Sequence, residues 1–159
     1  MIPGQTEAVV NNDLQYRGLH KEEKMLKKIL VVDDSALIHQ MYRLVMNRYN
    51  CTIADAMNGQ EALDILAVQP DIELILLDIN MPVMNGLQFM EKAAQLGIVK
   101  KIPIIVISTE GKEEDTIRGL KLGARGYLKK PFHPAGLHEM IDKIFPQPVG
   151  LQERPQATV

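Results

Sequence analysis

The sequence predicts an α/β fold in which a doubly wound, five-stranded parallel sheet is covered by helices on both faces. Short apolar runs of strand length alternate five times with helical patterns along the chain. Three of these runs are apolar without alternation, as in strands that are covered on both faces. The 159 residues, of which 46% are hydrophobic and 24% charged, suffice for one such domain with short extensions.

The apolar runs lie at residues 29–32, about 51–54, 74–77, 104–107 and about 126–128. The first, third and fourth runs predict central strands, whereas the short, mixed second and fifth runs indicate edge strands. With right-handed crossovers this pattern favours the strand order 2-1-3-4-5 in a three-layer (αβ)5 sandwich. The winding then reverses between the first and third strands, and such sheets bind ligands in the crevice at the carboxyl ends of those strands.

A helical pattern follows each predicted strand. The apolar residues that we expect on one face of each helix are Leu37, Met41, Leu44 and Val45 after about Ser35; Ala62, Ile65 and Leu66 after Asn58-Gly59; Leu87, Met90 and Ala94 after about Gly86; Ile117 and Leu120 after about Glu113; and Leu137, Met140, Ile141 and Ile144 in the last helix. The fourth of these stripes is the weakest.

Both ends of the chain have the composition of tails around a domain of residues 25–146. Residues 1–24 are polar and lack a sustained period, so we expect a flexible extension, or at most one short helix, that folding does not need. Residues 147–159 form a second tail, because the prolines around its start stop the last helix.

Composition argues against several classes of protein. A net charge of −2 gives no electrostatic reason to expect nucleic acid or a membrane surface as a partner. No signal peptide is recognisable, and no apolar run approaches the roughly 20 residues of a membrane span. The single cysteine, Cys51, rules out an internal disulfide and fits a reducing compartment. We therefore expect a cytoplasmic protein.

Three aspartates stand where two of the predicted strands end. Asp33 and Asp34 follow the first strand and Asp78 follows the third, so all three lie at the predicted crevice. Clustered carboxylates repel one another and raise each other's pKa unless they share a cation. Their oxygens suit Mg²⁺, which takes one or two carboxylates from a protein and keeps several waters. The sequence therefore predicts a magnesium site at this edge.

Each candidate side chain at this edge also has a simpler interpretation, which the sequence leaves open. Asp34 or Ser35 could cap the first helix, and Ser108 the fourth. Lys130 could be a solvated surface lysine, and Tyr127 a core aromatic of an edge strand. However, Lys130 leaves the fifth strand at the same edge as the aspartates. Its ammonium could hold one phosphoryl oxygen there, and the Ser108 hydroxyl another.

Two other kinds of site are disfavoured. Residues 33–36, after the first strand, match neither G-x-G-x-x-G nor G-x-x-x-x-G-K-[ST], so a nucleotide-binding enzyme is not indicated. The four histidines give no metal or catalytic signal in their spacing. The chemistry of the sequence is therefore concentrated in the aspartates, the lysine and the hydroxyl.

Four motifs in this order resemble the receiver domain of two-component response regulators. They are Val31-Val32-Asp33-Asp34-Ser35, Leu77-Asp78-Ile79-Asn80-Met81-Pro82-Val83-Met84-Asn85-Gly86, Ile107-Ser108-Thr109 and Tyr127-Leu128-Lys129-Lys130-Pro131-Phe132. The resemblance spans roughly residues 27–145 and implies a flavodoxin-like fold. Because no output domain follows, the sequence is most similar to single-domain regulators of the chemotaxis type.

The resemblance also implies which residues would bind the phosphoryl group and the metal. Asp78 would be the nucleophile that accepts a phosphoryl group from the phosphohistidine of a sensor histidine kinase or of a phosphotransfer protein. Asp33 and Asp34 would hold Mg²⁺ together with Asp78, and the backbone carbonyl of Asn80 would complete the protein ligands. Phosphoryl transfer depends mostly on in-line positioning and charge neutralisation, which such a site supplies.

The remaining motif residues would carry the signal. Ser108 and Lys130 would bind the phosphoryl oxygens, and Tyr127 would change rotamer on activation. In the family the peptide between Lys130 and Pro131 is typically cis. The changed surface would be read by a downstream protein, which the sequence does not identify, or by a second copy in a phosphorylation-dependent homodimer.

Two rival functions fit the sequence less well than a receiver does. An aspartyl-phosphate phosphatase of the haloacid dehalogenase type carries D-x-D after its first strand, whereas Asp33 and Asp34 are adjacent. A pseudo-receiver would be expected to lack an acceptor, metal or phosphoryl-binding residue, and this chain lacks none of them. We therefore predict a phosphorylatable switch that catalyses only its own phosphorylation and dephosphorylation, and no enzyme in the ordinary sense.

Overall fold

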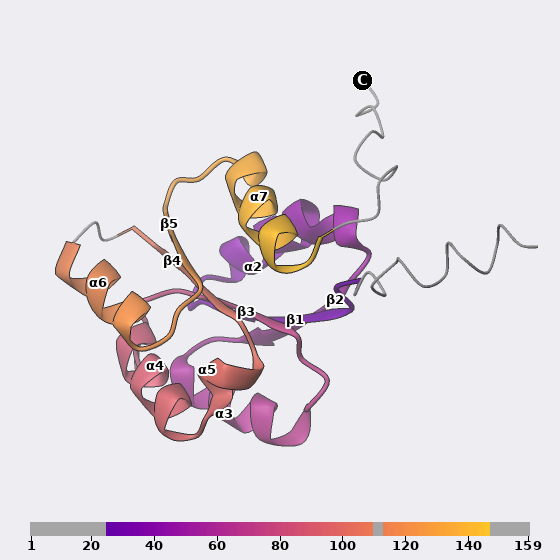
Figure 1. The fold of residues 1–159 in the computed structure, drawn as a ribbon. Helices are drawn as coiled ribbons and strands as arrows, with labels where there is room; N and C mark the ends of the chain where they lie inside the picture. Colours follow the sequence, from indigo (N-terminus) through magenta and orange to yellow (C-terminus); the bar gives the residue numbers. More distant parts are fainter. Residues whose placement is uncertain (1–24, 110–112, 147–159) are drawn as a thin grey trace, which may run out of the picture.

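The computed structural model describes residues 25–109 and 113–146, so the expectations for residues 1–24 and 147–159 lie outside the described residues. A parallel five-stranded sheet in the order β2-β1-β3-β4-β5 forms the middle layer, which confirms the predicted fold class and strand order (Figure 1). The strands are β1 (Lys28–Val32), β2 (Thr52–Ala56), β3 (Leu74–Leu77), β4 (Ile104–Ser108) and β5 (Gly126–Lys129).

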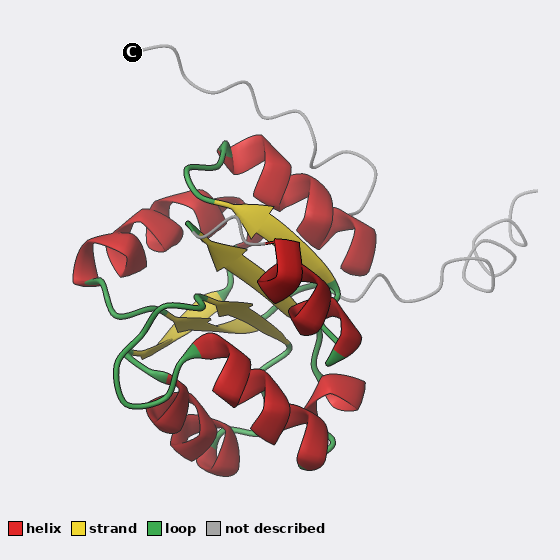
Figure 2. Ribbon diagram, turned by 90° about the vertical axis from the view of Figure 1, so that its left-hand side faces the viewer, coloured by secondary structure: helices red, strands yellow, loops and turns green. Residues whose placement is uncertain are grey.

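Helices cover both faces of the sheet. They are α2 (Ala36–Met46), α3 (Gly59–Val68), α4 (Gly86–Gln95), α5 (Ile98–Lys101), α6 (Glu113–Lys121) and α7 (Pro134–Ile144), with a 3₁₀ turn η1 (Asn47–Tyr49). Helices α2 and α7 lie on one face, and α3, α4 and α5 lie on the other, as Figures 1 and 2 show. The sequence did not predict α5 and η1, because each is too short to show a period.

The two faces of the sheet make separate cores. Ile29 and Val31 of β1 belong to the core under α2 and α7, and Leu30 and Val32 belong to the core under α3 and α4. All residues of β3 and β4 are buried, whereas β5 is only half-buried. The continuous apolar runs therefore marked the central strands correctly, and the site residues lie where these buried strands end.

The apolar face predicted for α2 is only half right. Met41 and Val45 pack, partly buried, against the core under α2 and α7, but Leu37 is 74% exposed and Leu44 is 81% exposed. The fully buried residues of the helix are His39, Tyr42 and Met46. The two stripes compete because each has helical spacing, and histidine and tyrosine can bury their rings when their polar atoms find partners. This rotation of α2 turns His39 toward the interior beside the end of β1.

Helix α6 is the least buried of the longer helices. Its only buried residue is Gly119, and Ile117 and Leu120 are 43% and 46% exposed. The stripe that the sequence marked as weakest thus belongs to the longer helix with the fewest buried residues. An ion pair between Arg118 and Glu91 of α4 joins its exposed surface to the neighbouring helix.

Candidate metal and phosphoryl site

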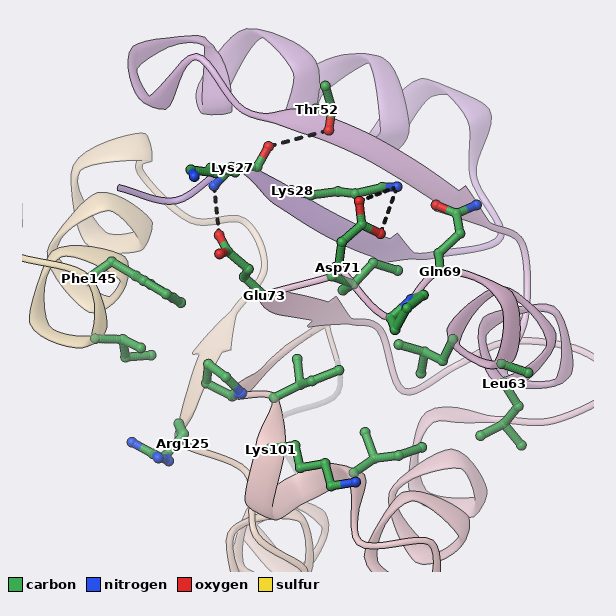
Figure 3. Close-up of a pocket in the computed structure, with 18 of the residues that line it drawn as sticks. Lys27, Lys28, Thr52, Leu63, Gln69, Asp71, Glu73, Lys101, Arg125 and Phe145 are labelled. Carbon is green, nitrogen blue, oxygen red and sulfur yellow. Dashed lines mark hydrogen bonds and ion pairs between the residues drawn. The ribbon is translucent and has the colours of Figure 1, made fainter. Parts of the chain in front are cut away.

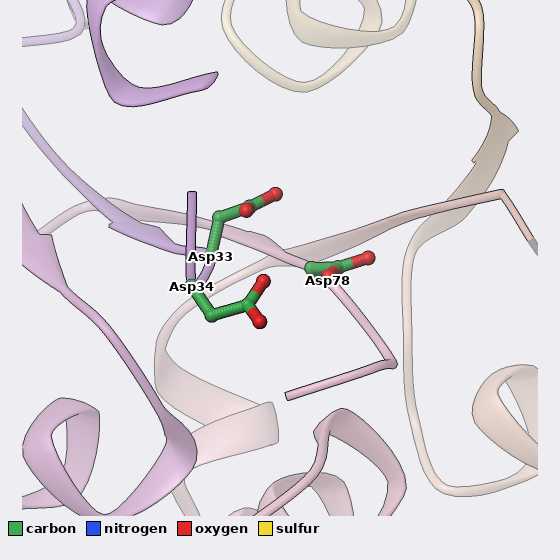
Figure 4. Close-up of side chains that lie close together, drawn as sticks. All are labelled: Asp33, Asp34 and Asp78. Atoms are coloured by element: carbon green, nitrogen blue, oxygen red, sulfur yellow. The ribbon is translucent and has the colours of Figure 1, made fainter. Parts of the chain in front are cut away.

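The structure brings the three predicted carboxylates together at the carboxyl ends of β1 and β3. Val32 pairs with Leu77 in the sheet, so the residues that follow these two strands emerge side by side. One carboxylate oxygen each from Asp33, Asp34 and Asp78 lies within 4.8 Å of the other two (Figure 4). Asp33 and Asp78 are buried, and Asp34 is exposed.

Asp33 is held at all of its polar atoms. Its backbone N–H donates to the Ala56 carbonyl at 3.0 Å, and its Oδ1 accepts from the Ser35 N–H at 2.9 Å. Its Oδ2 accepts from Lys130 Nζ at 2.6 Å, and its backbone oxygen accepts from His39 Nε2 at 2.7 Å. The Asp34 carboxylate, in contrast, has no protein partner among the described residues. The pair therefore combines one fixed carboxylate with one that is free to bind a cation.

Lys130 connects β5 to the carboxylates. Its ammonium lies 3.6 Å from Oδ1 of Asp78, and its side chain is 13% exposed. Burial raises the pKa of Asp78 to about 6, and the Lys130 ammonium limits this rise while Asp33 and Asp34 add to it. The peptide between Lys130 and Pro131 is cis, as the resemblance implied.

Ser108 lies at the same edge of the sheet, whereas Tyr127 lies within β5, two residues before that strand ends. Ser108 is the last residue of β4 and is fully buried, and it pairs with Lys129 in the sheet. Tyr127 pairs with Val106 and packs, half-buried, against the core under α3 and α4.

The loop between β3 and α4 presses against the Asp78 backbone. Asn85 caps α4 in a reciprocal pair with Gln88, and Gly86 N–H donates to the Ile79 carbonyl at 2.8 Å. A Cβ at Gly86 would lie 2.2 Å from the Asp78 carbonyl oxygen. Asn80, whose carbonyl is a predicted metal ligand, lies two residues beyond Asp78 and is exposed. The Asn-Gly pair is therefore a helix start that needs glycine for close approach.

These donors fit Mg²⁺. The ion requires oxygen ligands in octahedral geometry at about 2.0–2.1 Å, which places cis ligand oxygens about 2.9 Å apart. One oxygen from each of the three carboxylates lies within 4.8 Å of the other two, a grouping that a single ion can bridge. The exposed Asp34 leaves the site open on one side, so coordinated waters can complete the shell.

Sequence reasoning missed His39, Asp55 and Arg43, which lie behind the carboxylates. His39 contacts the backbone of Asp33 on one side and Asp55 on the other, and Arg43 pairs with Asp55. The available signal was weak: Asp55 is near the end of the second strand, and His39 and Arg43 are one turn apart on the first helix.

A separate pocket of about 990 Å³ lies at the opposite edge of the sheet, where the strands begin (Figure 3). The ammonium of Lys28 pairs with Asp71 at 3.1 Å, and the backbone N–H of Lys27 donates to Glu73 at 2.8 Å. None of the predicted site residues lines this pocket, so the cluster of carboxylates remains the candidate functional site.

Comparison with known proteins identifies the family. The sequence pattern of the response regulator receiver domain matches residues 29–142. The chain belongs to this family. A chemotaxis protein CheY homolog of Campylobacter jejuni is 35% identical over 118 residues, which cover 74% of this chain and 91% of that protein. Chemotaxis protein CheY1 of Helicobacter pylori is 36% identical, with 74% and 95% covered.

A solved structure has the same fold. The crystal structure of a CheX–CheY–BeF₃–Mg²⁺ complex from Borrelia burgdorferi contains a chain that is 27% identical to this one, with a TM-score of 0.71. The match covers 82% of this chain and 98% of that chain. Receiver domains of this type are signalling switches that bind Mg²⁺ through an acidic pocket and interact with kinases and other proteins. Within the described residues, no helix is both long and apolar enough to span a membrane.

Proposed function

We propose that this receiver accepts a phosphoryl group on Asp78, with Mg²⁺, from the phosphohistidine of a sensor kinase or phosphotransfer protein. One observation carries the proposal. Asp33, Asp34 and Asp78 meet at one sheet edge, where the Lys130 ammonium lies 2.6 Å from Asp33 and 3.6 Å from Asp78. Family membership supports the same function.

Asp78 is the carboxylate best placed to be the nucleophile. Ser35 and Lys130 engage both carboxylate oxygens of Asp33, and Asp34 is exposed. In the transfer, an Asp78 carboxylate oxygen forms a bond to phosphorus as the P–N bond of the phosphohistidine breaks. The bonding pair leaves with the imidazole nitrogen, which takes up a proton. Bound Mg²⁺ would neutralise charge on the phosphoryl oxygens.

Lys130 and Ser108 would bind the transferred group. The Lys130 ammonium already neutralises charge beside Asp78, and a phosphoryl oxygen there would gain a charge-assisted hydrogen bond. Ser108 ends the next strand after β3, so its hydroxyl is the group of β4 nearest the same edge. Phosphorylation would favour the arrangement of the β4 end in which both groups contact the phosphoryl oxygens.

The signal would travel from Ser108 to Tyr127 and α6. Tyr127 is half-buried one strand away, and α6 buries only Gly119, so both can change position at small cost in core packing. The surface made by α6, β5 and α7 would then differ between the two states, and a partner protein or a second copy would bind one of them.

Phosphorylation by acetyl phosphate with Mg²⁺, followed by intact mass measurement, tests the proposal. We expect one phosphoryl group, which hydroxylamine removes and which Asp78→Asn does not acquire. Asp71→Asn is the matched control, because Asp71 also pairs with a lysine but lies at the opposite edge of the sheet. The proposal fails if the Asp78→Asn variant gains the phosphoryl mass at the wild-type rate.

A further inference from the structure

His39 connects Asp33, one of the three clustered carboxylates, to the neighbouring edge strand β2. It is only 5% exposed, and its Nε2 donates to the backbone oxygen of Asp33 at 2.7 Å. Its Nδ1 lies 2.7 Å from Oδ1 of Asp55 in β2. The ring thus spans from Asp55 of β2 to the backbone of Asp33, the residue that follows β1.

Arg43 anchors the other end of this connection. Its guanidinium donates to both carboxylate oxygens of Asp55, and the contact to Oδ1 is 3.3 Å. Burial opposes ionisation of Asp55, but the hydrogen bonds from Arg43 and His39 outweigh it and hold the pKa of Asp55 below its ordinary value. Asp55 therefore remains an ionised acceptor that fixes the orientation of the His39 ring.

We propose that His39 is a positioning residue that holds the Asp33 backbone so that the Asp33 and Asp34 carboxylates face Asp78 before a cation binds. The inference rests on the proposed function, because it concerns the same Mg²⁺ site. The bond to Nε2 fixes the plane of the peptide that joins Asp33 to Asp34. Rotation of that peptide would move both carboxylates, and groups that orient metal ligands commonly change metal affinity when they are lost.

Asp33 makes three further hydrogen bonds, and none of them involves its carbonyl. The Ser35 N–H and the Lys130 ammonium bind its carboxylate, and its own N–H donates to the Ala56 carbonyl. Without His39 the carbonyl would be a buried acceptor that lacks this donor, and the peptide would turn toward another partner. The side-chain bonds alone do not hold the adjacent residue, Asp34, in place.

His138 offers a matched control within the same chain. Its Nε2 also donates to a backbone carbonyl at 2.7 Å, that of Val45 in α2, but it belongs to α7. Replacement of either histidine by alanine removes one ring and one bond to a backbone carbonyl. A purely structural role predicts similar effects of both changes on stability and on Mg²⁺ binding, whereas a positioning role predicts that only the change at His39 weakens Mg²⁺ binding.

Isothermal titration of the full-length chain with MgCl₂ tests the proposal. We expect the Mg²⁺ dissociation constant to rise about 10- to 100-fold in His39→Ala and less than twofold in His138→Ala. His39→Gln, whose side-chain amide can still donate to the Asp33 carbonyl, should recover most of the loss. Equal Mg²⁺ dissociation constants in wild type, His39→Ala and His138→Ala would overturn the proposal.

A second variant covers the case in which His39→Ala does not fold. Asp55→Asn keeps the shape of the acceptor but removes its charge, so we expect a rise in the Mg²⁺ dissociation constant of about threefold or more. An unchanged Mg²⁺ dissociation constant would overturn the proposal.

Acetyl phosphate labelling of the wild type is measured in parallel. If the wild type binds Mg²⁺ and is labelled, and the variants bind Mg²⁺ equally well, only the positioning role of His39 fails. If the wild type neither binds Mg²⁺ nor is labelled, the proposed function fails as well.

Discussion

The residues that follow β1 and β3, Asp33, Asp34 and Asp78, form a corner of the sheet that is held by hydrogen bonds from several elements, and we call it the braced corner. The outer segment, made of α6 and β5, is not held in this way. Asp33 receives hydrogen bonds from α2, from the turn that begins α2 and from the end of β5. Helix α6 buries only Gly119, and its pairing with α4 includes the exposed ion pair of Arg118 with Glu91. Exposed ion pairs of this kind contribute at most about 1 kcal/mol.

Under the proposed function, this difference would give the two regions different tasks. A metal site gains affinity when its ligands are held before the ion arrives, and the braced corner meets that condition. A switch needs an element with two arrangements of similar free energy, and α6 is the candidate for that element because Gly119 is its only buried residue.

The largest loss of stability is expected for Gly86→Ala. The new Cβ would lie 2.2 Å from the Asp78 carbonyl oxygen and 2.8 Å from Ile79 Cα, and both are backbone atoms that cannot turn away. We expect a loss of about 3 kcal/mol or more in the free energy of unfolding, or no folding, measured by urea denaturation. Gly136→Ala is the control, because its Cβ would meet only Leu128 Cδ1 at 3.8 Å. Similar effects of the two changes would show that the corner is not tightly packed.

Asp78→Asn should stabilise the protein at pH 7 in the absence of Mg²⁺. Burial raises the pKa of Asp78 from 3.8 to about 6, so the folded state binds this proton more tightly than the unfolded chain does. Stability is therefore lost as the pH rises from about 4 to above 6, by at most about 3 kcal/mol. Urea denaturation should show the variant more stable at pH 7 and equal to wild type near pH 4. A constant difference at both pH values would contradict this.

Mg²⁺ should stabilise the wild type and not Asp34→Ala. A cation that binds only the folded state at 100 times its dissociation constant adds about 2.7 kcal/mol. Because Asp34 is exposed and has no protein partner among the described residues, its replacement should cost little by itself. Melting temperatures with and without millimolar Mg²⁺ measure both effects. An equal rise in both proteins would place the ion elsewhere.

The smallest change in stability is expected for Gly119→Ala, in the outer segment. A Cβ there would lie 3.9 Å from Val106 Cγ2, which is ordinary contact, and alanine favours a helix interior over glycine by about 0.5–1 kcal/mol. We expect a gain of that size in the free energy of unfolding. Gly97→Ala should have the opposite sign, because φ at Gly97 is +74°. A loss of stability in Gly119→Ala would mean that α6 is packed more tightly than its burial indicates.

The sequence predicted the sheet order and the meeting of three carboxylates, because uninterrupted apolar runs marked the central strands. At α2 it was only half right, because two stripes of helical spacing compete and a tyrosine and a histidine occupy the buried one. His39 was missed for the same reason: its role depends on which face of α2 turns inward and on Asp55 of another strand. Spacing along the chain does not contain that information.

The most direct test of the two-region account is a map of backbone amide shifts on addition of beryllofluoride, a phosphoryl mimic, with Mg²⁺. The account predicts changes that extend from Asp78 to Tyr127 and residues 113–122, while α2 beyond its first turn keeps its shifts. Changes confined to the loop around Asp78 would contradict the route through Tyr127. Changes in α2 as large as those in α6 would contradict the braced corner.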